Sequence, residues 1–267
     1  MLNNLRMNLF RMKKNKLTYI LAGVSVGLYL LLFGVELLIS KARNGVLSGL
    51  EIETDLPLPD LTAARYNVFD SVVGMLMFLP MLTMMFTMIF FFTEISGGYA
   101  KNLIGYRGSK PACVCANLLT SLIFSFSVLL LSAFLGAVLS ALCYKNPTAE
   151  HTGKYLLFLL MSLAEIMAFN MVVLALGDLT NKHILLMIFG VIFVVYAPLV
   201  EELLSLGIYF LFEKEIDFYR YTILGGISNY SMETPAKDMI ISTVIALAEL
   251  GLGFVLDVAA LKKQELK

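Results

Sequence analysis

The sequence predicts an all-α polytopic membrane protein. We expect six transmembrane helices, an N-terminal amphipathic interfacial helix, and two short outer-leaflet helices between spans five and six. Hydrophobic residues make up 59% of the 267 residues, whereas soluble domains contain roughly 45–50%. Six apolar runs approach the roughly 20 residues that a helix needs to cross about 30 Å of hydrocarbon. Backbone polar groups in lipid must be satisfied within their own segment, so all six runs are expected to be helical.

The six expected spans belong to one transmembrane domain and cover residues 17–39, 72–93, 116–142, 156–177, 184–200 and 239–261. A further apolar run, 203–212, has about half the length that a span requires, so we expect it to be re-entrant or interfacial. Pro198 and Glu201–Glu202 are expected to end span five before it. Gly225–Gly226 interrupts the chain after it. We therefore expect residues 201–238 to form an extracellular or re-entrant segment.

The distribution of basic residues predicts that both termini are cytoplasmic. An even number of spans places the termini on one side, and lysine and arginine favour the cytoplasmic side. In that orientation, the cytoplasmic segments carry Arg6, Arg11, Lys13, Lys14, Lys16, Lys101, Arg107, Lys110, Lys182, Lys262, Lys263 and Lys267. The outer segments 40–71, 143–155 and 201–238 carry more acidic than basic residues. The sequence thus predicts a multi-pass protein of the plasma membrane.

Residues 1–16 form a basic amphipathic segment. At 100° per residue, one side of a helix carries the apolar residues Leu2, Leu5, Leu9 and Met12. The other side carries Asn4, Asn8 and Arg11. Such a helix lies in the membrane interface with its apolar side in lipid and its cations near anionic headgroups. It is either a topology anchor or an elbow that moves with span one.

Two small-residue repeats predict close packing between helices. Span one contains Gly23 and Gly27, four residues apart, and span three contains Ser132, Gly136 and Ser140 at the same spacing. Small residues at this spacing let two helices approach closely in lipid. Both repeats are therefore interpreted as packing seams.

Two glutamates lie near the middle of predicted spans. Glu165 and Glu249 are expected at a similar depth, because their spans run in the same direction. A charged side chain there costs about 2.5–3.5 kcal/mol on insertion scales, so both should face the bundle interior. They either line a wet cavity on the path of a cationic or amphipathic substrate, or are protonated and bond to Ser162 or another helix. Asp257, near the inner end of span six, is expected to reach water.

The sequence predicts no catalytic, metal or cofactor site. The paired glutamates Glu201–Glu202 resemble those of intramembrane proteases, but that pattern requires an arginine at position 206, which is leucine here, and downstream histidines. His151 and His183 both lie upstream. The three cysteines, at 113, 115 and 143, are expected to be buried thiols. The formal net charge of zero gives no electrostatic case for nucleic-acid binding.

The segment 94–110 separates spans two and three on the cytoplasmic side. Glu94 and Ser96 can cap a short helix, and Gly97–Gly98 permits a sharp turn after span two. Basic residues follow at positions 101, 107 and 110. The segment is either a basic loop that sets topology or a helix that docks onto a cytosolic partner.

In this segment the sequence "EISGGYAKN", from Glu94 to Asn102, has the pattern Glu-x-x-x-Gly-x-x-Lys-Asn. With the amphipathic start, six spans and two outer-leaflet helices, it resembles the membrane subunit of an ABC exporter of the type 2 family. The resemblance implies a permease that works as a homo- or heterodimer, with segment 94–110 as the coupling helix in a groove of the ATPase. The coupling residues would be Glu94, Gly97, Gly98, Lys101, Asn102 and Arg107.

The same resemblance implies how energy and substrate are supplied. The chain has no G-x-x-x-x-G-K-[ST] motif, so ATP and Mg would be bound by a separate cytosolic ABC ATPase subunit. Small members of the family resemble exporters of lantibiotics or modulin peptides. An amphipathic peptide, or a drug, is therefore the expected substrate, and this chain itself is not expected to be an enzyme.

Two alternatives from other classes remain open. A secondary transporter would use Glu165 and Glu249 as a proton relay. A membrane scaffold or sensor subunit would transport nothing. Inhibition by a proton-gradient uncoupler distinguishes the first, and the absence of an ATPase partner supports the second.

Overall fold

The computed structural model describes residues 2–45, 66–67, 78–96, 110–143, 147–148, 152–212 and 236–264. Its helices are α1 (Leu2–Lys14), α2 (Lys16–Gly45), α4 (Leu79–Ser96), α6 (Lys110–Cys143), α7 (Thr152–Thr180), α8 (His183–Phe212) and α10 (Ala236–Gln264). Two strands of two residues, β1 (Tyr66–Asn67) and β2 (Pro147–Thr148), pair in parallel. The helical class predicted from the apolar runs is confirmed.

Four of the described helices are long and apolar enough to cross a membrane. They are α2, α6, α7 and α10. The apolar parts of α4 and α8, Leu79–Thr93 and His183–Tyr196, are shorter. Residues 72–77 of the expected second span lie outside the described residues, and the rest of that span is in α4.

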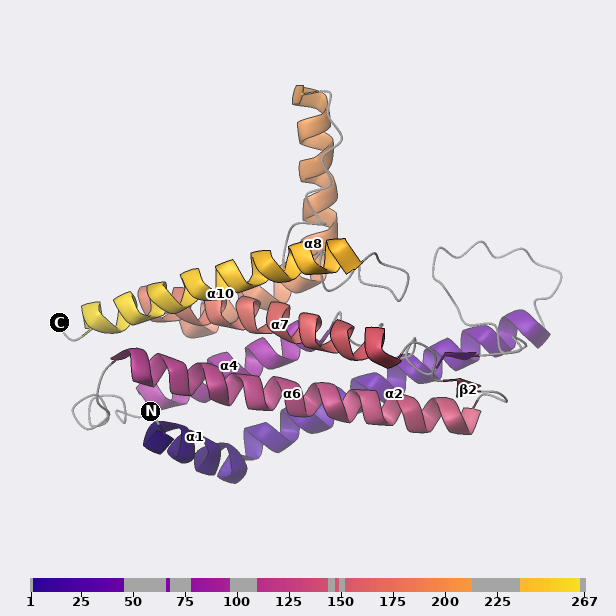
Figure 1. Ribbon diagram of the computed structural model, residues 1–267, viewed down its shortest axis with the longest axis horizontal. Coiled ribbons are helices and arrows are strands. Elements are labelled where there is room, and N and C mark those ends of the chain that lie inside the picture. Colours follow the sequence, from indigo (N-terminus) through magenta and orange to yellow (C-terminus); the bar gives the residue numbers. More distant parts are fainter. Residues whose placement is uncertain are drawn as a thin grey trace.

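Successive helices of the bundle run in alternating directions (Figure 1). The start of α1, the end of α4, the start of α6, the α7–α8 turn and the end of α10 all lie towards one end. The ends of α2 and α6 and the starts of α7 and α10 lie towards the other. The α4–α6 connection and the α7–α8 turn are far apart in sequence. They are therefore anchored at the same end of the bundle, where both termini also lie.

Helix α7 is the central element. In its most apolar window 72% of the residues are buried, against 22–33% in α2, α6 and α10. It packs against α10, α4, α6 and α8. Aromatic stacking fills the neighbouring space between α4 and α6, where the ring centroids of Phe86 and Phe124 are 3.7 Å apart. Most side chains of α7 are therefore shielded from the surroundings of the bundle.

The outer surface of the bundle is apolar. Large hydrophobic side chains are exposed on α6, α7, α8 and α10, among them Phe134, Leu160, Phe189, Val244 and Leu252. Extended apolar patches of this kind are rare on monomeric soluble proteins. Lipid contact explains them directly, in agreement with the hydropathy of these helices.

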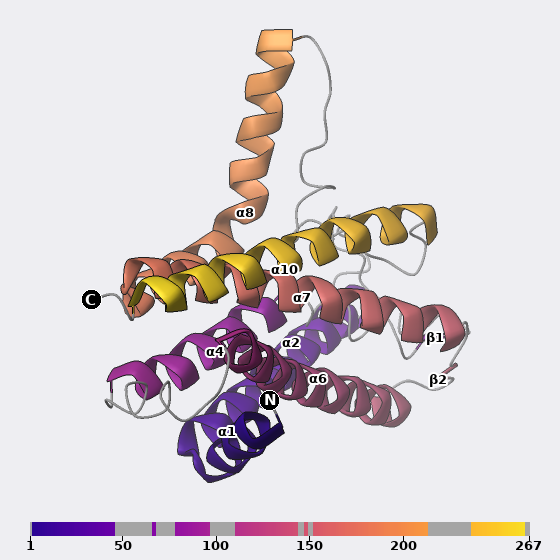
Figure 2. The same ribbon diagram turned by 60° about the vertical axis from the view of Figure 1, so that its left-hand side comes forward.

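The break expected between span five and residues 203–212 is absent, so that prediction is wrong. Helix α8 continues from His183 to Phe212. It bends, and its later part leaves the bundle (Figures 1 and 2). Pro198 accounts for a bend without a break, because proline removes one backbone hydrogen bond and kinks the helix. The remaining part of the expected outer segment, 213–235, lies outside the described residues.

The two small-residue seams have different outcomes. Ser132, Gly136 and Ser140 are buried, as a packing seam on α6 requires. Gly23 and Gly27 are exposed, and no described atom lies within 4 Å of a Cβ built at either position. The α2 repeat is therefore not used in packing within the described part of the chain.

Candidate functional site: polar and acidic groups around α7

Glu165 faces the interior of the bundle, as its sequence position predicts. Both Glu165 and Ser162, one turn earlier on α7, are completely buried. The Ser162 hydroxyl makes no hydrogen bond within the described part of the chain. Ser162, one of the partners considered for a protonated Glu165, therefore does not bond to it.

Glu249 is half-buried on α10, which runs parallel to α7 (Figure 1). Two contacts fix the register of these helices: the carboxyl of Asp257 meets that of Asp178, and Gly253 packs against Met171. The first contact places Glu249 about five residues, or roughly 8 Å, further along the bundle axis than Glu165, and the second about two residues, or roughly 3 Å. The two glutamates therefore lie at a similar but not identical depth.

Hydroxyl and amide groups connect α7 with its neighbours α4 and α6. Thr83 of α4 donates to the amide oxygen of Asn170 on α7 over 3.4 Å. The hydroxyl oxygens of Thr87 and Ser121 are 2.7 Å apart and join α4 to α6. Such bonds fasten helices together where lipid offers no hydrophobic drive for association. The interior near Glu165 is therefore more polar than the outer surface of the bundle.

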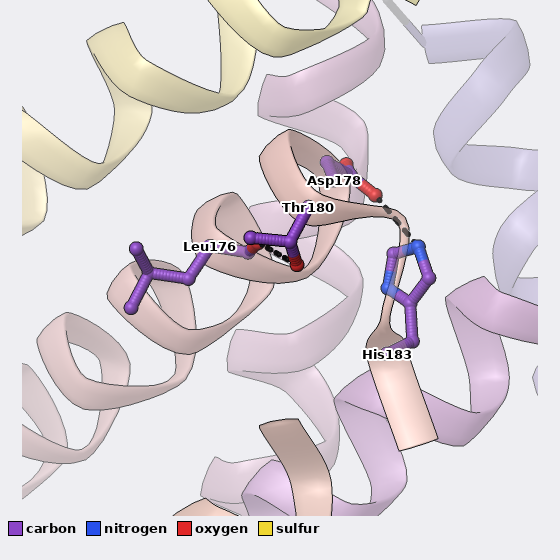
Figure 3. A network of polar contacts seen from close by, with 4 residues as sticks. All are labelled: Leu176, Asp178, Thr180 and His183. Carbon is purple, nitrogen blue, oxygen red and sulfur yellow. Dashed lines mark hydrogen bonds and ion pairs between the residues drawn. The ribbon is translucent and has the colours of Figure 1, made fainter. Parts of the chain in front are cut away.

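A buried contact between a histidine and an aspartate lies where α7 turns into α8. His183 Nε2 is 3.4 Å from Asp178 Oδ1, and the two side chains point toward each other across the turn (Figure 3). Asn181 takes a left-handed conformation, with φ of 55°. Asparagine tolerates that conformation better than most residues. The chain can thus reverse within two residues and return His183 to Asp178.

Asp257 of α10 completes this group, which we name the Asp178–His183–Asp257 cluster. The carboxyl of Asp257 lies against that of Asp178 and is 0% exposed. The expectation that Asp257 reaches water is therefore wrong. The reason is that α10 packs along α7 as far as this end, so that the solvated residues come later, at Lys262 and Lys263.

Sequence reasoning missed this cluster, although a signal for it existed. Asp178 and His183 flank a short connection, and Asp257 was expected near the same end of its span. Phe92 of α4 also approaches it, with its ring centroid 5.4 Å from that of His183. In the described part of the chain, no three His, Cys, Asp or Glu side chains are arranged to hold a metal ion.

Helix α1 docks onto the bundle through its polar side. Asn4 and Asn8 are buried, and the Asn8 amide donates to Asn117 Oδ1 of α6 over 3.1 Å. The guanidinium of Arg11 lies 4.9 Å from the ring centroid of Phe90. The apolar residues lie further out: Leu2 is exposed, and half-burial is found at Leu5, Leu9 and Met12. The helix is confirmed, and its asparagine side, not anticipated as a contact, faces protein.

The residues expected to couple the chain to an ATPase fall mostly outside the described residues. Glu94 lies in the last turn of α4. The others, Gly97, Gly98, Lys101, Asn102 and Arg107, are not among the described residues.

Comparison with protein-family models finds no match for this sequence, and comparison with curated proteins finds none either. The functional argument therefore rests on the chain itself.

Proposed function

We propose that this chain is the membrane-spanning subunit of an ATP-driven exporter of hydrophobic or amphipathic peptides or drugs. The observation that carries the proposal is the arrangement of the apolar helical bundle. One end collects the start of α1, the end of α4, the start of α6 and the end of α10 (Figure 1). A cytosolic ATPase at that end would meet the segment 94–110 between α4 and α6.

In this proposal the chain crosses the plasma membrane six times with both termini in the cytoplasm. The shorter apolar helices, Leu79–Thr93 and His183–Tyr196, supply the two spans beyond the four long ones. A second permease subunit completes the transporter. Residues Glu165, Ser162 and Glu249 line or neighbour the substrate path, because polar groups at membrane depth are functional by default.

A second candidate is a proton-coupled secondary transporter. Four acidic side chains favour it, all on the adjacent helices α7 and α10: Glu165, Asp178, Glu249 and Asp257. Rows of carboxyl groups inside a bundle are typical of proton relays. This candidate predicts transport that stops with an uncoupler and requires no ATPase.

The experiment is affinity purification of the chain from its native membrane in mild detergent. The exporter proposal expects an ATPase subunit in nearly equal amount, with ATP hydrolysis stimulated by substrate. Lys101→Glu should abolish that stimulation, while Lys263→Glu, at an exposed position of α10, should leave it intact. Repeated recovery of this chain alone argues against the exporter. Equal stimulation in both variants argues against a coupling role for segment 94–110.

A further inference from the structure

The Asp178–His183–Asp257 cluster is shielded from solvent although all three side chains ionise. Asp178 is 5% exposed, His183 3% and Asp257 0%. They come from three different helices, and Phe92 of α4 lies beside His183. Thirteen residues of α7 separate Asp178 from Glu165, which is about 20 Å along the helix. The cluster is therefore distinct from the proposed substrate path.

The contact between Asp257 and its neighbouring carboxyl cannot be a hydrogen bond while both groups are ionised. The neighbouring group is the carboxyl of Asp178. Without a proton, neither Asp257 oxygen has a hydrogen-bond partner within the described residues. An ionised carboxyl only accepts hydrogen bonds, whereas a protonated one also donates. A hydrogen bond between the two groups thus exists only when one of them holds a proton.

Among the described residues, no neighbouring charge replaces that proton from the side of Asp257. No lysine, arginine or histidine within the described ranges makes an ion pair with Asp257. On the surrounding elements, Lys182, Lys262 and Lys263 are exposed, and Lys110, at the start of α6, is half-buried. Side chains of residues 94–109 lie outside the described residues. Two carboxylates in contact at low dielectric repel each other strongly, and a shared proton removes that repulsion.

Asp178 lies between two partners. Asp257 meets it from α10, and His183 Nε2 approaches its Oδ1 from α8. A proton shared by the aspartates leaves one negative charge. Burial disfavours the charged form of His183, so its imidazole is neutral and can direct its Nε2–H toward that charge.

We propose that Asp178 and Asp257 form a single buried proton-binding site, which holds one shared proton and has the imidazole of His183 beside it. The shared proton connects α10 to the α7–α8 turn. The inference does not depend on the exporter proposal, because it concerns this chain alone and needs neither substrate nor partner.

Infrared spectroscopy of the purified full-length protein tests the proposal, because protonated and ionised carboxyl groups absorb at different frequencies. Spectra are recorded at neutral pH for the wild type, Asp178→Asn, Asp257→Asn and the double variant. Relative to the wild type, the double variant should lose one protonated-carboxyl band together with the absorption of one carboxylate, and neither single variant should lose a second protonated band. Glu202→Gln, at an exposed position of α8, should remove only carboxylate absorption.

Two results would overturn the proposal. If the double variant loses only carboxylate absorption, both aspartates are ionised in the wild type. If the double variant loses two protonated bands, each carboxyl holds its own proton. Circular dichroism checks that the variants remain helical. Isotope-labelled aspartate in the wild-type protein gives an independent test, because it shifts the aspartate bands and leaves those of Glu165 and Glu249 unchanged. Absence of a shifted protonated band would also overturn the proposal.

Discussion

His183 can occupy its buried position because residue 177 has no side chain. A Cβ built on Gly177 would lie 2.6 Å from His183 Nδ1 and 3.0 Å from the terminal methyl carbon of Met88. Both distances are too short for ordinary van der Waals contact. The glycine is therefore a steric requirement for the contact between His183 and Asp178.

We predict that Gly177→Ala lowers the thermal stability of the detergent-solubilised protein. Overpacking of a filled interior costs about 1–3 kcal/mol, which exceeds the roughly 0.5–1 kcal/mol that alanine otherwise contributes in a helix. Gly153→Ala on the same helix is the control, since its Cβ would meet nothing within 4 Å. His183→Ala should relieve much of the cost in the double variant. Equal melting temperatures for the two alanine variants would contradict the steric argument.

The bond between Asn8 and Asn117 should hold α1 against α6. Interhelical hydrogen bonds in membrane proteins average about 0.6 kcal/mol in double-mutant cycles. We expect a coupling of this size between Asn8→Ala and Asn117→Ala, measured by thermal unfolding. Asn3→Ala, at an exposed position of α1, should show no coupling with Asn117→Ala. Strictly additive effects of Asn8→Ala and Asn117→Ala would show that the bond contributes nothing.

At the scale of the elements, the most extensive contact is between α7 and α10. A Cβ on Gly253 would lie 3.1 Å from Met171 Cγ and 3.2 Å from backbone atoms of Met171 and Val172. A backbone cannot move aside as a flexible side chain can. The separation of the two helices is therefore set by the absence of a side chain at position 253, four residues before Asp257.

We predict that Gly253→Ala pushes α10 away from α7 and weakens the contact between Asp257 and Asp178. The melting temperature should fall, and the protonated-carboxyl band of the aspartate pair should be reduced. Gly251→Ala lies two residues away on the same helix, where a Cβ meets nothing within 4 Å, so both readouts should stay unchanged. An unchanged spectrum in Gly253→Ala would contradict this prediction. It would show that the shared proton does not depend on the close packing of α7 and α10.

The helices could be predicted because run length and the need for internal hydrogen bonds leave few alternatives in lipid. Their contacts could not. Hydropathy treats Pro198 and Glu201–Glu202 as a boundary, whereas α8 continues through them. It also gives no partner for Asp257, because a single amphipathic pattern does not say which neighbouring helix faces a given side. In a soluble protein the polar side of an amphipathic helix faces water, whereas Asn8 faces the protein. Lipid makes the protein interior the better place for an amide.

The whole molecule combines an apolar outer surface with polar contacts inside the bundle. Its long helix α6 contains 34 residues, or about 50 Å at 1.5 Å per residue, which is more than the thickness of the hydrocarbon core. Cys113 and Cys115 lie near its start, and Cys143 is its last residue. None of the three forms a disulfide within the described part of the chain, so thiol labelling can report the membrane side of both ends of this proposed span.

We predict that a membrane-impermeant thiol reagent applied to intact cells labels this chain at Cys143, which is exposed. Cys143→Ser should abolish that labelling. Inside-out vesicles of the same variant should be labelled at Cys113 or Cys115, which are half-buried at the other end of α6. Labelling of intact cells that survives Cys143→Ser would place the start of α6 outside and invert the proposed topology. That outcome would also place the segment 94–110 on the side where no cytosolic ATPase could reach it.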